Sequence, residues 1–68
     1  MKANEALRIM HQHGCTKVRQ KGSHVRIVCA CGKHFTTLPM HAGEELGPGL
    51  LRAIERDLEA CLGKGWLR

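Results

Sequence analysis

The run from His24 to Cys29 constrains the fold more than any other part of this chain. Val25, Ile27 and Cys29 occupy alternate positions, and period-two alternation is typical of a β-strand with one face buried and the other in water. His24 and Arg26 then point away from the core. The run therefore predicts a sheet whose open face carries a histidine and a guanidinium group.

A second strand is predicted over Cys15–Gln20, immediately before a turn that contains glycine. If Thr16 and Val18 point toward the same core, Lys17 and Arg19 lie on the open face. Strand parity then places these two cations beside the histidine and the arginine of the first run.

The remaining segments complete a small α+β fold. A third strand is expected over His34–Leu38, ended by Pro39. Apolar residues at helical spacing predict a helix over Ala3–His13 and another that begins at Pro48, after a glycine-rich loop over Met40–Gly49. We expect the order helix, three strands, helix, with both helices on one face of an antiparallel sheet.

Size and charge limit the classes of function. A chain of 68 residues holds one hydrophobic core, so a single domain over residues 1–68 is expected. Residues 1–41 contain seven Lys and Arg residues against one Glu, a net charge of +6, and all five histidines; residues 42–68 contain four basic and five acidic residues. A cationic half indicates a polyanion partner, of which nucleic acid is the commonest. The plainer alternative is a solvated surface with a basic bias.

The cysteines are expected to be reduced. No run approaches the roughly 18–20 apolar residues of a membrane span, and the first residues do not lead into a signal peptide. We therefore expect a cytoplasmic protein without membrane contact. In that compartment Cys15, Cys29, Cys31 and Cys61 are expected to be free thiols that help to fill the core.

Zinc binding is the main alternative for the cysteines. Cys29, Cys31, His34 and His41 together offer four zinc ligands. The spacing argues against such a site, because one residue separates the two cysteines where about two to four are usual. Both cysteines are also expected on the inward strand face. The sequence predicts neither a metal nor another cofactor.

Three segments carry residues in a distinctive order and spacing: Arg19–Arg26 (RQKGSHVR), Pro39–His41 (PMH) and Glu45–Ile54 (ELGPGLLRAI). Together they resemble the HicA toxin family, and the element order with a cationic sheet face also resembles the double-stranded-RNA-binding fold. The resemblance implies an mRNA interferase of a type II toxin–antitoxin system, an RNA-cleaving toxin that a HicB-like antitoxin neutralises. It also implies that His24, at the motif position, is the catalytic histidine.

The chemistry of RNA cleavage agrees with that assignment. RNA supplies its own nucleophile, the 2′-OH, so a metal-free ribonuclease needs mainly proton transfer and charge stabilisation. Histidine suits proton transfer because its unperturbed pKa is about 6.5. We expect His24 to be the acid or base, Lys21 or Arg26 to hold the phosphate, and Gly22 and Ser23 to donate hydrogen bonds to it. The alternative for His24 is an exposed histidine without a task.

Further RNA contacts are expected from cations elsewhere in the chain. The candidates for binding backbone phosphates are Lys17, Arg19, Lys33 and Arg52. His41 is expected to contact RNA and is the candidate for a second proton transfer, with ordering of the glycine-rich loop as its alternative. Two functions stay open: an endoribonuclease toxin, monomeric alone and hetero-oligomeric with its antitoxin, and a non-catalytic RNA-binding domain of the same fold.

Overall fold

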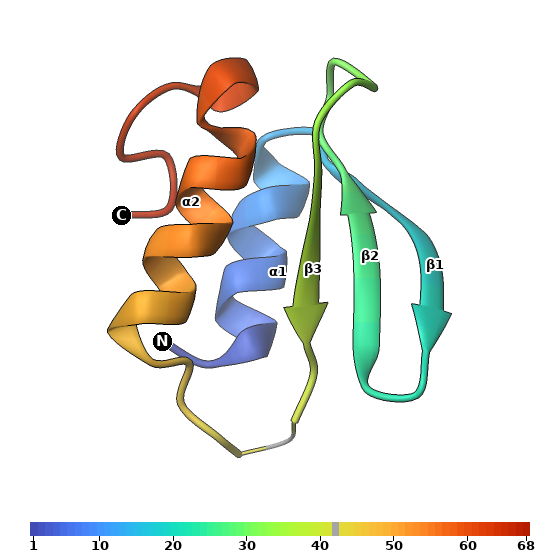
Figure 1. Ribbon diagram of the computed structural model, residues 1–68, viewed down its shortest axis with the longest axis vertical. Helices are drawn as coiled ribbons and strands as arrows, with labels where there is room; N and C mark the ends of the chain where they lie inside the picture. Colours follow the sequence, from blue (N-terminus) through green and yellow to red (C-terminus); the bar gives the residue numbers. More distant parts are fainter. Residues whose placement is uncertain (42) are drawn as a thin grey trace.

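The computed structural model describes residues 1–41 and 43–68 and has two layers (Figure 1). A three-stranded antiparallel sheet of order β1-β2-β3 forms one layer, and two helices form the other. The elements are α1 (Ala3–Gln12), β1 (Thr16–Lys21), β2 (His24–Val28), β3 (Phe35–Pro39) and α2 (Pro48–Leu62). The predicted α+β order of helix, three strands and helix is confirmed. Neither helix of the described ranges has the length and apolar character needed to cross a bilayer.

The core lies between the two helices and the inner face of β2 and β3. Val25 and Ile27 of β2 and Leu38 of β3 are buried, and they join one apolar cluster with Met10 of α1 and Ile54 of α2. The alternation predicted for β2 is confirmed, because successive side chains of a strand point to opposite faces. The open face of the sheet therefore belongs to the residues between these positions.

β1 departs from the predicted alternation. All of its residues are exposed, since the helices pack on the β3 side of the sheet and β1 is the far edge strand (Figure 1). A bulge between Lys17 and Arg19 inserts one extra residue, so that Lys17 pairs with Ile27 and Arg19 pairs with Arg26. Val18, which was predicted to face the core, is 56% exposed. The prediction is wrong because a bulge interrupts the period of two.

Lys17 consequently lies on the opposite face of the sheet from Arg19. Its cross-strand partner Ile27 is fully buried under the helices, and directly paired residues share a face. The Lys17 ammonium contacts the Gln20 side-chain oxygen at 3.4 Å, and Gln20 pairs with the buried Val25. The expected position of Lys17 on the open face is therefore wrong.

A disulfide joins Cys29 to Cys61, where free thiols were expected. Cys29 directly follows β2 and Cys61 lies in the last turn of α2, and the two meet because α2 packs across the sheet. Cys15 is a buried free thiol as expected, whereas Cys31 is exposed. β2 ends at Val28, so Cys31 belongs to a turn and not to an inward strand face.

The residues after α2 fold back onto the core. Trp66 is 6% exposed, and Leu67 beside it is also buried. The Trp66 indole N–H donates a hydrogen bond to the backbone carbonyl of Glu55 in α2, with a distance of 2.7 Å between nitrogen and oxygen. Trp66 and Leu67 thereby join the apolar cluster between the helices and the sheet.

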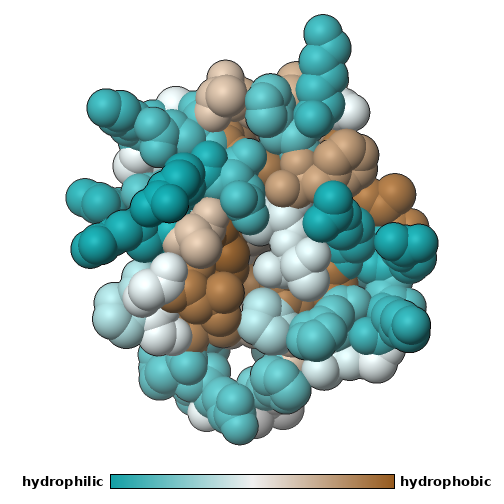
Figure 2. Space-filling model, in the orientation of Figure 1, coloured by the Kyte–Doolittle hydropathy of each residue, from teal (hydrophilic) through white to brown (hydrophobic). Residues whose placement is uncertain are grey.

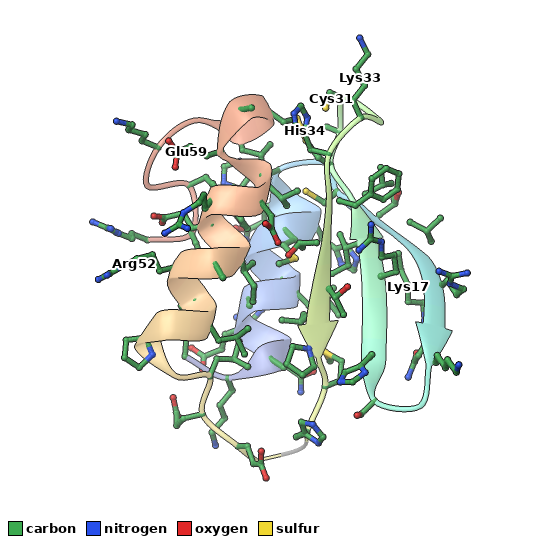
Figure 3. The ribbon with its side chains drawn as sticks, viewed as in Figure 1. Lys17, Cys31, Lys33, His34, Arg52 and Glu59 are labelled. Carbon is green, nitrogen blue, oxygen red and sulfur yellow. A yellow bond between two sulfur atoms is a disulfide. The ribbon has the colours of Figure 1, made fainter. Side chains whose placement is uncertain are left out.

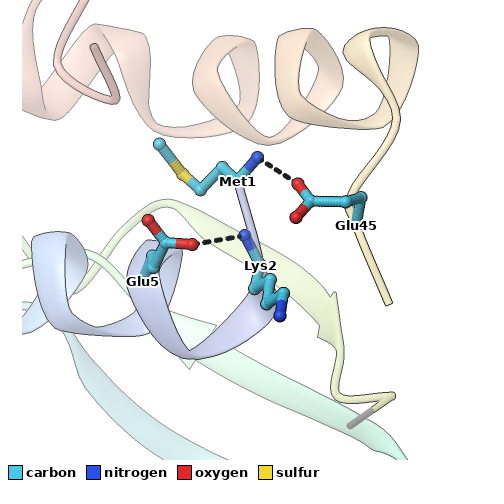
Figure 4. A network of polar contacts seen from close by, with 4 residues as sticks. All are labelled: Met1, Lys2, Glu5 and Glu45. Atoms are coloured by element: carbon cyan, nitrogen blue, oxygen red, sulfur yellow. Dashed lines mark hydrogen bonds and ion pairs between the residues drawn. The ribbon is translucent and has the colours of Figure 1, made fainter. Parts of the chain in front are cut away.

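A small polar network holds the start of α1 against the loop that precedes α2 (Figure 4). The Met1 amine lies 2.7 Å from a Glu45 carboxylate oxygen, and the Lys2 backbone N–H donates to the Glu5 carboxylate at 3.0 Å. The hydrogen bond from the amine lowers the pKa of Glu45 below its ordinary value and raises that of the Met1 amine. The loop that follows β3 is thereby tied to α1.

Candidate functional site

The turn between β1 and β2 places His24 at the start of β2. Gly22 and Ser23 form a two-residue connection between Lys21 and His24, which pair with each other. Gly22 has a φ of +59°, as the first position of a type II′ hairpin turn requires. The Met40 N–H donates to the Ser23 carbonyl at 2.6 Å. This bond fixes the turn against the end of β3.

Cross-strand pairing brings four of the predicted site residues together on the open face. Lys21 pairs with His24, and in the next row Arg19 pairs with Arg26, which pairs in turn with Thr37 of β3. Directly opposed side chains have Cβ atoms about 4.5–5.5 Å apart. An imidazole, an ammonium and two guanidinium groups therefore share a small area of the sheet.

These side chains line an open pocket of about 400 Å³. Its lining residues are Arg19, Lys21, His24, Arg26 and Thr37. All five are exposed, and β1, β2 and β3 contain no acidic residue. In the described part of the chain, both ion pairs lie outside this pocket. Its positive charge is uncompensated, which favours an anionic ligand.

Arg26 is held in place by two neighbours on β3. Its Nη1 donates to Thr37 Oγ1 at 3.2 Å, and its guanidinium lies over the Phe35 ring, 5.1 Å from the centroid. A cation–π contact at an exposed site is worth about 0.5–1 kcal/mol. Sequence reasoning missed both partners, although they alternate with Thr36 and Leu38, the buried residues of this strand. That alternation is the signal that places them on the open face.

Apolar residues border the pocket. Val18 and Phe35 are 56% and 40% exposed, and together with Arg19 and Arg26 they line a neighbouring hollow of about 350 Å³. Figure 2 shows hydrophobic surface among hydrophilic residues at the right of the view, where the strands lie. Exposed apolar side chains therefore lie directly beside the guanidinium groups on the open face.

The other predicted residues are not brought into the pocket. Lys33 lies at the tip of the connection between β2 and β3, and Arg52 projects from α2 on the side away from the strands (Figure 3). Lys17 occupies the other sheet face. His41 follows β3 and lines a different pocket, of about 180 Å³, beside the start of α1. The geometry therefore leaves His24 as the imidazole of the open pocket.

One family of known proteins matches most of this chain. A family profile described as "HicA toxin of bacterial toxin-antitoxin" matches residues 3–60. The match includes the whole sheet and every residue that lines the open pocket, and it ends before the last turn of α2 is complete. No curated protein and no solved structure gives a significant match. The chain therefore belongs to the HicA toxin family of bacterial toxin–antitoxin systems.

Proposed function

We propose that this toxin is an mRNA interferase that cleaves RNA in the open pocket around His24. One observation carries the proposal: an exposed imidazole shares a pocket with Arg19, Lys21 and Arg26, on a sheet without acidic residues. An RNA strand supplies one phosphate per nucleotide, and cations that neutralise phosphates dominate affinity for nucleic acids. Membership of a toxin family supports the same role, exercised on mRNA in the cytoplasm.

His24 moves a proton in the proposed reaction. Loss of a proton from the 2′-OH lets its oxygen form a bond to the adjacent phosphorus, while the bond from phosphorus to the 5′ oxygen breaks and that oxygen gains a proton. We assign one of these two transfers to the His24 imidazole. Proton transfer by a positioned side chain contributes about 10²–10⁴-fold to the rate. These steps need no metal ion.

The cations of the pocket hold the phosphate in the proposed reaction. Arg26 is oriented in advance by Thr37 and Phe35, so it loses little freedom when it donates to phosphate oxygens. Lys21 lies directly across the strand pair from His24 and adds positive charge beside the proton-transfer group. Preorganised donors at the position where negative charge develops stabilise the transition state.

We propose that a HicB-like antitoxin neutralises the toxin by covering this face. The exposed side chains of Val18 and Phe35 lie beside Arg19 and Arg26, and interfaces combine an apolar centre with polar and charged groups around it. A partner seated there would exclude RNA from His24. The toxin is then a monomer alone and part of a hetero-oligomer with its antitoxin.

Purified toxin is expected to cleave naked RNA in the presence of EDTA, because His24 and the cations supply the chemistry. Gel analysis of end-labelled RNA measures cleavage, and far-UV circular dichroism in the same buffer checks that chelation leaves the fold intact. Loss of cleavage by a folded protein under chelation contradicts the metal-free reaction. Absence of cleavage under all conditions, with RNA binding retained, favours a non-catalytic RNA-binding domain on the same face.

Matched variants of β1 test which sheet face binds RNA. Arg19→Gln is expected to weaken binding and to reduce the slope of log affinity against log salt concentration by about one, because one phosphate contact is lost. Lys17→Gln removes the same charge from the opposite face and is expected to leave the affinity nearly unchanged. Titration of a 2′-O-methyl RNA, which lacks the nucleophile, measures both. Equal losses in the two variants contradict binding at the open face.

A further inference from the structure

A cluster of metal-binding side chains lies at the other end of the sheet from the open pocket. The Sγ atoms of Cys29, Cys31 and Cys61 all lie within 4.8 Å of one another. The His34 Nδ1 atom lies 3.2 Å from the Cys31 sulfur, and Figure 3 shows these two residues together in the connection between β2 and β3. The fold thus gathers three cysteine sulfurs from two distant parts of the chain, and the His34 imidazole lies against one of them, that of Cys31.

We propose that Cys29, Cys31, His34 and Cys61 bind one zinc ion when the disulfide is reduced. Three cysteines and one histidine form a common structural zinc set, with tetrahedral geometry, Zn–S distances of about 2.3 Å and Zn–N distances of about 2.0–2.1 Å. Two ligand atoms of such a tetrahedron lie about 3.4–3.8 Å apart. The Cys31 sulfur lies 3.5 Å from the Cys29 sulfur and 3.2 Å from the imidazole nitrogen, close to that spacing.

The turn after β2 presents Cys31 to the cluster. Gly32 has a φ of +76°, which lets the chain reverse and brings the Lys33 N–H to the Cys31 sulfur at 3.4 Å. This contact and the 3.2 Å contact with the His34 ring hold the Cys31 sulfur at the cluster.

The ligand set differs from the one that the sequence offered. The sequence argued against zinc from the one-residue spacing of Cys29 and Cys31 and, separately, from their expected place on one strand face. The strand ends before either of them, which removes the second reason. His41 lies beside the start of α1 and does not belong to the cluster. Cys61, which was expected to be a free thiol that helps to fill the core, takes its place as the fourth ligand.

Reduction precedes metal binding in this proposal. A dithiol gives two electrons and two protons to the Cys29–Cys61 bond, is itself oxidised to a disulfide, and leaves two cysteine thiols. Zn²⁺ then replaces three thiol protons, which pass to the buffer, and accepts the lone pair of His34 Nδ1. The Cα atoms of Cys29 and Cys61 lie 6.7 Å apart, at the wide end of the range of about 4.4–6.8 Å for disulfides. Little backbone movement is needed to admit an ion.

The ion has a structural role that is independent of the proposed cleavage. It joins the connection between β2 and β3 to the last turn of α2, in a chain so short that a structural metal is a common means of stabilisation. Cys29 follows directly after β2 and lies five positions beyond His24, or about 16 Å at a rise of about 3.3 Å per residue. No group of the open pocket belongs to the cluster.

Titration of the reduced full chain with Co²⁺ and Zn²⁺ tests the site, after the dithiol has been removed under anaerobic conditions. We expect one ion per chain by native mass spectrometry. The cobalt complex is expected to show the visible bands of tetrahedral coordination and a near-ultraviolet charge-transfer band from thiolates, both lost when zinc displaces cobalt. The oxidised chain, with two of its sulfurs in a disulfide, is expected to bind neither ion.

Variants at the surface of the cluster identify the ligands. Cys31→Ser and His34→Gln leave the core intact and are expected to weaken zinc binding by more than about 100-fold, since even an outer-shell partner is worth about 10- to 100-fold. Cys15→Ala and His11→Gln, outside the cluster, are expected to bind as the wild type does. The proposal is overturned if the reduced wild type forms no one-to-one complex with either ion, or if Cys31→Ser and His34→Gln bind zinc undiminished. Neither result bears on RNA cleavage.

Discussion

Replacement of His24 by alanine is expected to lower the rate of RNA cleavage by about 10²–10⁴-fold, the usual contribution of one general acid or base. The side chain is exposed and the backbone of the turn is set by Gly22 and by the Met40–Ser23 hydrogen bond, so the variant is expected to fold. Single-turnover cleavage of labelled RNA measures the effect, and growth after induction in cells reports the loss of toxicity.

Two variants separate the chemical role of His24 from binding. His11→Ala, on the exposed side of α1, removes an imidazole far from the pocket and is expected to cleave at the wild-type rate. Arg26→Gln is expected to weaken RNA binding, whereas His24→Ala is expected to keep most of it. Undiminished cleavage by folded His24→Ala would show that the proton transfer belongs to another group.

Replacement of Trp66 by alanine is expected to destabilise the fold by about 3–5 kcal/mol, the usual cost of removing a large buried aromatic side chain. A domain of this size has only about 3–5 kcal/mol of total stability, so much of the variant is expected to be unfolded at room temperature. Trp66 is buried, donates to Glu55 and meets the His13 ring edge-on with centroids 6.0 Å apart. Urea unfolding followed by far-UV circular dichroism measures the change.

Conservative variants show which part of Trp66 matters. Trp66→Phe keeps most of the apolar contact and loses the hydrogen bond to Glu55, for an expected cost of about 1 kcal/mol plus a smaller packing loss. Leu50→Ala, at an exposed position of α2, is expected to change stability little. If Trp66→Ala unfolds at the same urea concentration as the wild type, the tail does not support the core.

Local patterns predicted the element order and the residues at the centre of the candidate site. The alternation in β2 placed Val25 and Ile27 inward and His24 and Arg26 outward, because the direction of a strand side chain depends only on the parity of its position. The turn at Gly22 and the end of β3 at Pro39 also follow from local backbone preferences. These features involve residues that are close in sequence, so they could be predicted without knowledge of the core.

The contacts that the side chains of β3 make with Arg26 could be identified only from the pairing of the strands. Phe35 and Thr37 bear no charge and match no catalytic motif, and their importance comes from contact with Arg26 across the strand pair. The position of His41 also depended on the tertiary structure. It was expected to contact RNA with the other site residues, but the course of the chain after β3 places it beside the start of α1. Distance along the chain is a poor guide to distance in space once a strand has ended.

The alternating run at His24 and the helical stripes were thus enough to specify an α+β domain with a cationic open face. The position of Lys17 was decided by a bulge, which depends on how β1 matches β2 and not on the composition of either strand. The meeting of Cys29 with Cys61 was decided by the docking of α2 on the sheet, 32 residues further along the chain. Patterns in a sequence report which face of an element is apolar, whereas contacts between elements depend on how those faces pack together.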